Sequence, residues 1–189
     1  MESALIVSCT GKSAAFFTEI LNEASVSQIT VIKSTAEARR VIMEKDFDLV
    51  VVDAPLEDES GESLCRHIAS RNLPQVILAV SGEAFDAASA ACEGYGVLTI
   101  AKPVSREMFW SALSLAKSAS NKIQRIQAEN AHLKQKIEDI RIIDRAKCLL
   151  ISYLNLSEQE AHRFIEKQSM DLRTTKRAIA EGILKTYAS

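Results

Sequence analysis

Five short apolar runs, separated by helix-length segments, most constrain the fold of this chain. Two of them, 49–52 and 76–80, are apolar at every position, which is typical of parallel strands that are covered on both faces. The five runs predict strands at 4–8, 29–32, 48–53, 75–80 and 97–101, and the segments between them predict helices near 13–24, 35–46, 61–71 and 83–92, with another after Pro103. Five such β-α units predict a doubly wound α/β sheet, in which functional groups gather at the carboxyl ends of the strands.

The segment after this domain has a different pattern. From Ser105 to Tyr153 there is no proline and no glycine, so one helix can continue throughout. Within it, residues at alternating spacings of three and four form the a/d pattern of a coiled coil: Ile123, Ile126, Asn130, Leu133, Ile137 and Ile140. Asn130 at an a position favours a parallel dimer, and Glu129 and Lys134 can pair between the two helices. The alternative is an amphipathic helix that folds back on its own domain.

Two further short helices are predicted at the end of the chain. Ser157 and Glu160 have the spacing of a capping box that opens a helix over 158–168. Asp171 or Thr174 is expected to cap another helix over 173–186. Three short helical pieces make a core too small for robust independent folding. We therefore expect dimerisation through the coiled coil to stabilise them.

Charge is distributed unevenly along the chain. Residues 1–120 hold 10 Lys and Arg against 16 Asp and Glu, whereas 121–189 hold 13 against 9, for an overall net charge of −2. A basic tail behind an acidic domain indicates a nucleic-acid partner. An aromatic fraction of only 5% argues against an aromatic platform for stacking bases.

Cysteine spacing and the N-terminus indicate the compartment. The four cysteines form no CxxC pair, which excludes the usual patterns of zinc sites and disulfide frameworks. The segment from Met1 to Ser3 has no basic signal-peptide region, and no apolar run reaches the length of about 18 residues that a membrane span needs. We expect a cytoplasmic protein with reduced thiols.

The residues at the ends of the predicted strands carry a first resemblance. LVVVDAPLEDESG, VILAVSGE and LTIAKPVS place Asp53, Ser81 and Lys102 at three strand ends. Residues 1–120 thereby resemble a response-regulator receiver domain, which has a flavodoxin-like (βα)5 fold. The resemblance implies that Asp53 is the phosphoacceptor, that Ser81 and Lys102 hold phosphoryl oxygens, and that Lys102–Pro103 is a candidate cis peptide.

The same site departs from the receiver pattern. Two acidic residues that help bind Mg²⁺ are expected at the end of the first strand, but Ser8 and Cys9 stand there. Glu57 and Ile100 replace a usual proline and a usual aromatic residue. Two alternatives follow: a Mg²⁺-dependent phosphoacceptor, or, preferred here, a pseudo-receiver that serves in dimerisation or partner docking. Asp53 alone is also compatible with a plain loop-capping role.

The tail carries a second resemblance. AKCLLISYLNLSEQEAHRFIEKQSMDLRTTKRAIAEGIL is similar to an ANTAR domain, the RNA-binding module of transcription antitermination regulators, over about 140–186. The predicted organisation is therefore a receiver-like domain at 1–120, a coiled-coil linker at 121–142 and an ANTAR domain at 143–189. Cys148 stands where the family usually has glycine.

The ANTAR resemblance implies a non-enzymatic antiterminator that binds paired hairpins in nascent RNA as a homodimer. A sensor kinase or a ligand-sensing protein would supply its signal. Cations from all three helices are the candidate RNA contacts: Arg145, Lys147, Arg163, Lys167, Arg173, Lys176 and Arg177. Because aromatic residues are few, recognition would depend on phosphates, hairpin shape and loop bases. A DNA-binding response regulator, or a protein-interaction module held inactive by a partner, are the alternatives.

Overall fold

The structure, a computed structural model, describes residues 1–70 and 74–187 and divides into two compact units, Met1–Gln124 and Arg125–Ser189. We describe each unit separately. Within the described residues, no helix is both long enough and apolar enough to cross a membrane.

The first unit is built on a five-stranded sheet in the order β2-β1-β3-β4-β5, with all neighbouring strands parallel. Its register pairs Ser8 with Asp53 and Ser81 with Lys102, which brings the predicted site residues to one edge of the sheet. The strands are β1 (Ser3–Ser8), β2 (Gln28–Ile32), β3 (Leu49–Asp53), β4 (Gln75–Ser81) and β5 (Leu98–Lys102).

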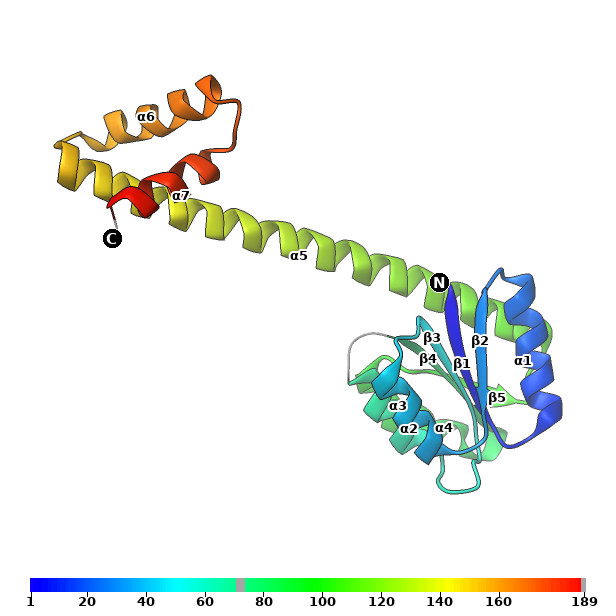
Figure 1. The fold of residues 1–189 in the computed structure, drawn as a ribbon. Coiled ribbons are helices and arrows are strands. Elements are labelled where there is room, and N and C mark those ends of the chain that lie inside the picture. The colour runs from blue at the N-terminus through cyan, green and yellow to red at the C-terminus, as the bar shows by residue number, and fades with distance from the viewer. Residues whose placement is uncertain (71–73, 188–189) are drawn as a thin grey trace. The chain divides into compact units, whose positions relative to one another are not determined.

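Helices cover both faces of this sheet, so there are two cores (Figure 1). One core packs α2, α3 and α4 against the sheet, and the other packs α1 and the start of α5 (Arg106–Leu154), where Phe17 and Phe109 are buried with ring centroids 4.8 Å apart. The helices of this unit are α1 (Gly11–Glu23), α2 (Thr35–Glu44), α3 (Glu62–Ala69), α4 (Phe85–Cys92) and the short 3-10 turns η1 (Gly82–Ala84) and η2 (Glu93–Tyr95).

Local sequence accounts for where several of these helices begin. The Ser34 side chain accepts a hydrogen bond from the Glu37 backbone N–H and caps α2. Gly61 precedes α3 with φ of 90°, and a Cβ there would lie 3.2 Å from the side chains of Val52 and Ala54. Glycine is therefore required both by the backbone conformation and by the close approach of β3.

The helix α5 (Arg106–Leu154) continues from the first unit into the second, where α6 (Glu158–Asp171) and α7 (Lys176–Tyr187) pack on its last turns (Figure 1). This three-helix bundle has a small core of residues from all three helices: Ala146, Leu150, Ala161, Ile165, Ala180 and Ile183. The capping box predicted at Ser157 and Glu160 is confirmed, with both reciprocal hydrogen bonds present.

The expected fold is confirmed, and most element boundaries agree within two or three residues. The cap predicted for the last helix is wrong. Asp171 is the last residue of α6, and the Thr174 N–H is used to close the turn by donating to the Ser169 carbonyl. The Thr175 hydroxyl instead accepts from the Ala178 N–H, because α7 begins later than expected. The predicted end of the helix at 61–71 lies outside the described residues.

Candidate phosphoacceptor site and nucleic-acid interface

Asp53 lies at the end of β3 and is almost fully buried, with 3% of its surface exposed. The Lys102 ammonium lies 2.6 Å from Asp53 Oδ1 and also donates to the Ala54 carbonyl. The Ser8 hydroxyl donates to Asp53 Oδ2 at 2.7 Å, and the Thr10 hydroxyl lies 3.5 Å from the same oxygen. Both carboxylate oxygens therefore already have a partner supplied by the chain.

The two residues at the end of β1 have different environments. Ser8 is buried and faces Asp53. Cys9 is half-buried, packs beside the core on the α2–α4 side of the sheet, and its Sγ lies 3.5 Å from the Lys33 carbonyl oxygen. Only Ser8 thus joins the Asp53 cluster.

Ser81 lies beside Lys102 in the sheet register but lines a different hollow from Asp53. The hollow with Ser81 is formed by the loops after β3 and β4. The Asp53 cavity has a volume of about 280 Å³ and is lined by Lys12, Ser13, Phe16, Phe17, Asp53, Lys102, Pro103 and Val104. The peptide bond between Lys102 and Pro103 is cis, as predicted, and the one between Ala54 and Pro55 is cis as well.

The donor set around Asp53 does not fit a Mg²⁺ ion. Mg²⁺ needs near-octahedral oxygen ligands and is usually bound by one or two carboxylates together with waters and substrate phosphates. Here a single buried carboxylate is present, and its Oδ1 faces an ammonium group at 2.6 Å. A divalent cation at that oxygen would be repelled by the Lys102 charge, while Ser8 would have to give up its hydrogen bond to Oδ2.

A contact that the sequence did not reveal ties the loop after β3 to the start of α2. The Asp58 carboxylate accepts hydrogen bonds from the Thr35 hydroxyl at 2.5 Å and from the Thr35 and Ala36 N–H groups at 2.9 and 3.3 Å. The hydrogen bond from Thr35 holds the pKa of Asp58 below its usual value. Sequence patterns do not predict this contact, because Thr35 and Asp58 lie 23 residues apart.

Three of the seven candidate RNA-contacting cations are held in ion pairs within the bundle. Lys147 lies 2.8 Å from Asp144 and 3.1 Å from Glu158, and Lys176 lies 2.7 Å from Glu166. Arg177 contacts two acids at once, Asp139 at 2.7 Å and Glu181 at 2.8 Å. Lys147 joins α5 to α6, and Lys176 and Arg177 join α7 to α6 and α5, so the three cations have a structural role in the free protein.

The other four candidate cations are exposed: Arg145, Arg163, Lys167 and Arg173. Within the described residues, none of the four is in an ion pair. The basic character of the bundle surface therefore comes from side chains that are available to a ligand.

The expected coiled-coil positions of α5 are all exposed to solvent in the single chain. The five apolar ones are between 41% and 58% exposed, from Ile123 to Ile140, and Asn130 is exposed among them. At about 100° per residue, these positions lie on nearly the opposite side of α5 from Ala146 and Leu150, which face α6 and α7. The exposed stripe and the bundle therefore use different faces of the helix.

Comparison with known proteins identifies both halves. The family model described as the response regulator receiver domain matches residues 5–114, and the ANTAR domain model matches residues 131–184. The transcriptional regulatory protein PdtaR of Mycobacterium tuberculosis is 28% identical over 142 residues, which is 75% of this chain and 69% of the relative. The nitrate regulatory protein of Klebsiella oxytoca is 28% identical over 76 residues, 40% of this chain and 19% of the relative.

Solved structures agree on the fold of the first unit. The signal receiver domain of a putative LuxO repressor protein from Vibrio parahaemolyticus has a TM-score of 0.58 at 17% identity and covers 67% of this chain and 98% of that one. The beryllofluoride-activated NtrC4 receiver domain dimer has a TM-score of 0.57 at 22% identity, over 64% and 99%. The chain belongs to the response regulators, with a receiver domain followed by an ANTAR domain.

Proposed function

We propose that this protein is a transcription antitermination regulator that acts in the cytoplasm, binds paired hairpins in nascent RNA as a parallel homodimer, and is not an enzyme. The observation that carries the proposal is the segment matched by the ANTAR model, which folds as a three-helix bundle with four exposed, unpaired candidate cations among its described residues. Phosphate neutralisation supplies much of the affinity of such a surface for RNA.

The exposed stripe on α5 supports the dimer. A row of half-exposed apolar side chains along a long helix is stabilised when a second copy covers it, and Asn130 at an a position favours two parallel strands. Because the stripe and the bundle use opposite faces of α5, pairing leaves α6 and α7 accessible. Two tethered bundles would bind two adjacent hairpins and gain avidity from the tether.

The receiver domain, in this proposal, works without phosphate. Asp53 already has a cationic partner and a hydrogen-bond donor within the fold, and its surroundings do not fit Mg²⁺. A phosphodonor reaction at Asp53 would have to separate the Lys102 ion pair without a metal to offset the developing charge. The domain would then receive its signal by docking a sensor protein.

A binding titration at fixed salt tests the function. The probes are an RNA with two adjacent small-loop hairpins, the same RNA with scrambled loops, and duplex DNA. We expect loop-dependent binding to RNA that is the same with a small phosphodonor plus Mg²⁺ and in Asp53→Ala. Preferential binding to duplex DNA would support the alternative DNA-binding regulator, and binding only after phosphodonor treatment would overturn the phosphate-independent receiver.

The dimer is tested by placing charge on the stripe. Leu133→Lys with Ile137→Lys is expected to halve the mass measured by sedimentation and to weaken binding to the two-hairpin RNA by about 100-fold or more, because the avidity is lost. Ala128→Lys with His132→Lys adds the same charge at exposed positions outside the stripe and should leave the mass unchanged. An unchanged mass in the double variant would contradict the coiled-coil dimer.

A further inference from the structure

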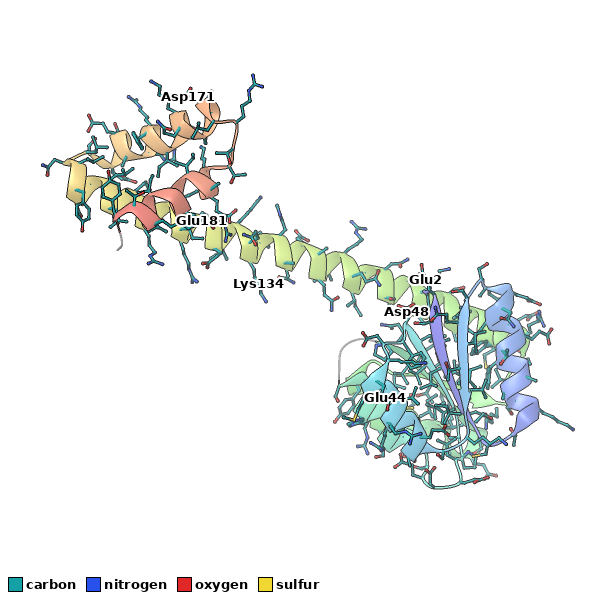
Figure 2. All side chains as sticks on the ribbon, viewed as in Figure 1. Glu2, Glu44, Asp48, Lys134, Asp171 and Glu181 are labelled. Atoms are coloured by element: carbon teal, nitrogen blue, oxygen red, sulfur yellow. The ribbon has the colours of Figure 1, made fainter. Side chains whose placement is uncertain are left out.

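We propose that the connection between α6 and α7, residues Met170, Asp171, Leu172 and Arg173, here called the tip, contacts unpaired bases in the loop of the RNA hairpin. This inference rests on the proposed function and deepens it, because it assigns base recognition to one short segment. Figure 2 shows Asp171 at the end of α6, where the chain turns towards α7.

The tip exposes two large apolar side chains close together. Met170 is 73% exposed and Leu172 is 65% exposed, more than any other large apolar side chain described in the second unit. A single exposed apolar side chain is ordinary on a protein surface. Met170 and Leu172 are two exposed apolar side chains only two positions apart, in a unit with a small core. Together they form a surface that the flat face of a base can cover.

A rigid turn holds these side chains in place. The Leu172 N–H donates to the Gln168 carbonyl at 3.0 Å, and the Thr174 N–H donates to the Ser169 carbonyl at 2.9 Å. Ser169 is itself buried, and its hydroxyl donates to the Glu166 carbonyl at 2.7 Å. The backbone that carries the two apolar side chains is therefore held in place, which lowers the part of the binding entropy that comes from ordering the turn.

Arg173 occupies a backbone conformation that favours glycine. Its φ is 49°, and a side chain in the left-handed region at the end of a helix costs free energy that glycine avoids. The Arg173 N–H donates to the Met170 carbonyl at 3.2 Å, so the turn offsets part of this cost, but the exposed guanidinium group forms no ion pair with any described residue. Strained positions of this kind gather at functional sites, and a polyanion is the partner that a guanidinium group fits best.

A row of cations on α6 leads to the tip. Arg163, Lys167 and Met170 follow one another at spacings of four and three, so they share one face of α6. Glu166 is paired with Lys176, whereas Glu160, in the first turn of α6, keeps its negative charge while it accepts hydrogen bonds from Ser157. Phosphates are therefore expected to bind towards the Lys167 end of this face, beyond that first turn.

The charge of Asp171 favours contact of the tip with the bases of the RNA and disfavours contact with its phosphates. Its carboxylate, exposed between Met170 and Leu172, repels phosphates but accepts hydrogen bonds from the amino groups of bases. Apolar side chains with an acceptor and one guanidinium group fit splayed-out loop bases, which proteins recognise by stacking and by hydrogen bonds to their edges. The arrangement thus places phosphates on the face of α6 and loop bases at the tip.

Two variants of the full chain test the proposal against the two-hairpin RNA and its loop-scrambled version. Met170→Ser with Leu172→Ser should reduce the preference for the intact loop by about tenfold, with little change in the salt dependence of binding. Met43→Ser, at a residue 72% exposed in the receiver domain, is the matched control and should change neither quantity. Abasic nucleotides in the loop should reproduce the loss in the unaltered protein.

Arg173→Gly separates a binding role from a structural one. Because glycine relieves the backbone, the melting temperature should stay the same or rise, while RNA affinity falls about tenfold and the slope of log affinity against log salt decreases by about one. A lower melting temperature with unchanged affinity would overturn the role of Arg173. An unchanged loop preference in the Met170 and Leu172 variant would overturn the proposal that the tip contacts loop bases. If the unaltered protein does not bind RNA, the proposed function itself is rejected.

Discussion

Both units of this protein have surface ion pairs, but among the described residues only the first also has an ion pair that holds a buried charge. Asp53 is 4% exposed at its side chain and is held by Lys102, whereas Arg106 joins α5 to Glu19 and Glu23 of α1 at the surface. In the second, the pairs lie near the surface and join helices, as Arg177 does between α7 and α5. Removing one partner of a buried ion pair leaves an uncompensated charge in the interior and is strongly destabilising. A single surface ion pair contributes little to the free energy of unfolding. The comparison indicates that the first unit is fixed by its core and that the second depends on the sum of small contributions.

The two units also differ in the size of their apolar cores. The first unit has two apolar layers, one on each face of the sheet. The second has six buried apolar residues, which is close to the lower limit for independent folding. Changes of the same kind should therefore have unequal consequences in the two units, and the variants below test this inequality.

The largest effect is expected from Leu150→Ala. Leu150 is 1% exposed in the bundle core, and loss of its side chain should cost about 2–5 kcal/mol, enough to unfold the second unit. Two transitions in calorimetry should separate, with the sheet domain melting as before. Leu78→Ala, at a fully buried position of β4, is the control and should lower only the other transition. Equal shifts of both transitions in either variant would show that the units fold as one.

Lys102→Ala should destabilise the sheet domain by about 2 kcal/mol, because it leaves the Asp53 charge buried without its cationic partner. Asp53→Asn should cost clearly less, since the neutral amide keeps a hydrogen-bonding group beside Ser8. Chemical denaturation measures both. If Asp53→Asn were the more harmful of the two, the ion pair would be a source of stability and not simply a requirement of a buried charge.

Gly61→Ala should destabilise the same domain by about 1–2 kcal/mol, because φ of 90° is unfavourable for a residue with a Cβ. The added methyl group would also meet Val52 and Ala54 at 3.2 Å. Gly94→Ala, where nothing lies within 4 Å of the added atom, is a control and should change the unfolding free energy little. Equal effects of the two substitutions would exclude crowding and backbone strain at Gly61.

The smallest effect is the response to acid. Hydrogen bonds from Lys176 and Arg177 lower the pKa of Glu166 and Asp139 in the folded bundle. A lowered folded pKa gives stability that is present above the unfolded values, about 4, and is lost as pH falls through the folded pKa. Melting of the bundle should therefore shift modestly downward between about pH 5 and pH 3. A Glu166→Gln variant should show a smaller shift, and an equal shift would contradict the role of that pair.

Sequence patterns predicted the strands well, because a parallel strand covered on both faces is apolar at every position, as 76–80 is. Through the resemblance and the rule that strand ends share an edge, they predicted that Asp53 and Lys102 lie together, but not that Ser81 would line a different hollow. They could not predict that Ser8 and Cys9 would face different surroundings, or that Asp58 would cap α2, because these depend on side-chain directions and contacts between distant segments.

The cations illustrate the same limit. Composition indicated a basic tail but could not distinguish Lys176 and Arg177, which are held by acids, from Arg163 and Arg173, which are not. The positive φ of Arg173 also left no trace in the sequence, since glycine or asparagine is the usual signal of such a position. Sequence predicts which elements form, and the contacts between them decide which charges remain available.

Because α5 runs without a break from Arg106 to Leu154, the number of residues in it fixes the angle about the helix axis between the exposed stripe and the face that carries α6 and α7. Each residue turns the helix by about 100°, so inserting seven residues between Ile140 and Ala146 would nearly restore the angle between the exposed stripe and the face that carries the bundle. Inserting two would turn the bundle by about 200° and bring it to the side on which a second helix would pair. If two copies pair through the stripe, insertions close to a whole number of helical turns, such as seven or eleven residues, should therefore preserve RNA binding better than an insertion of two.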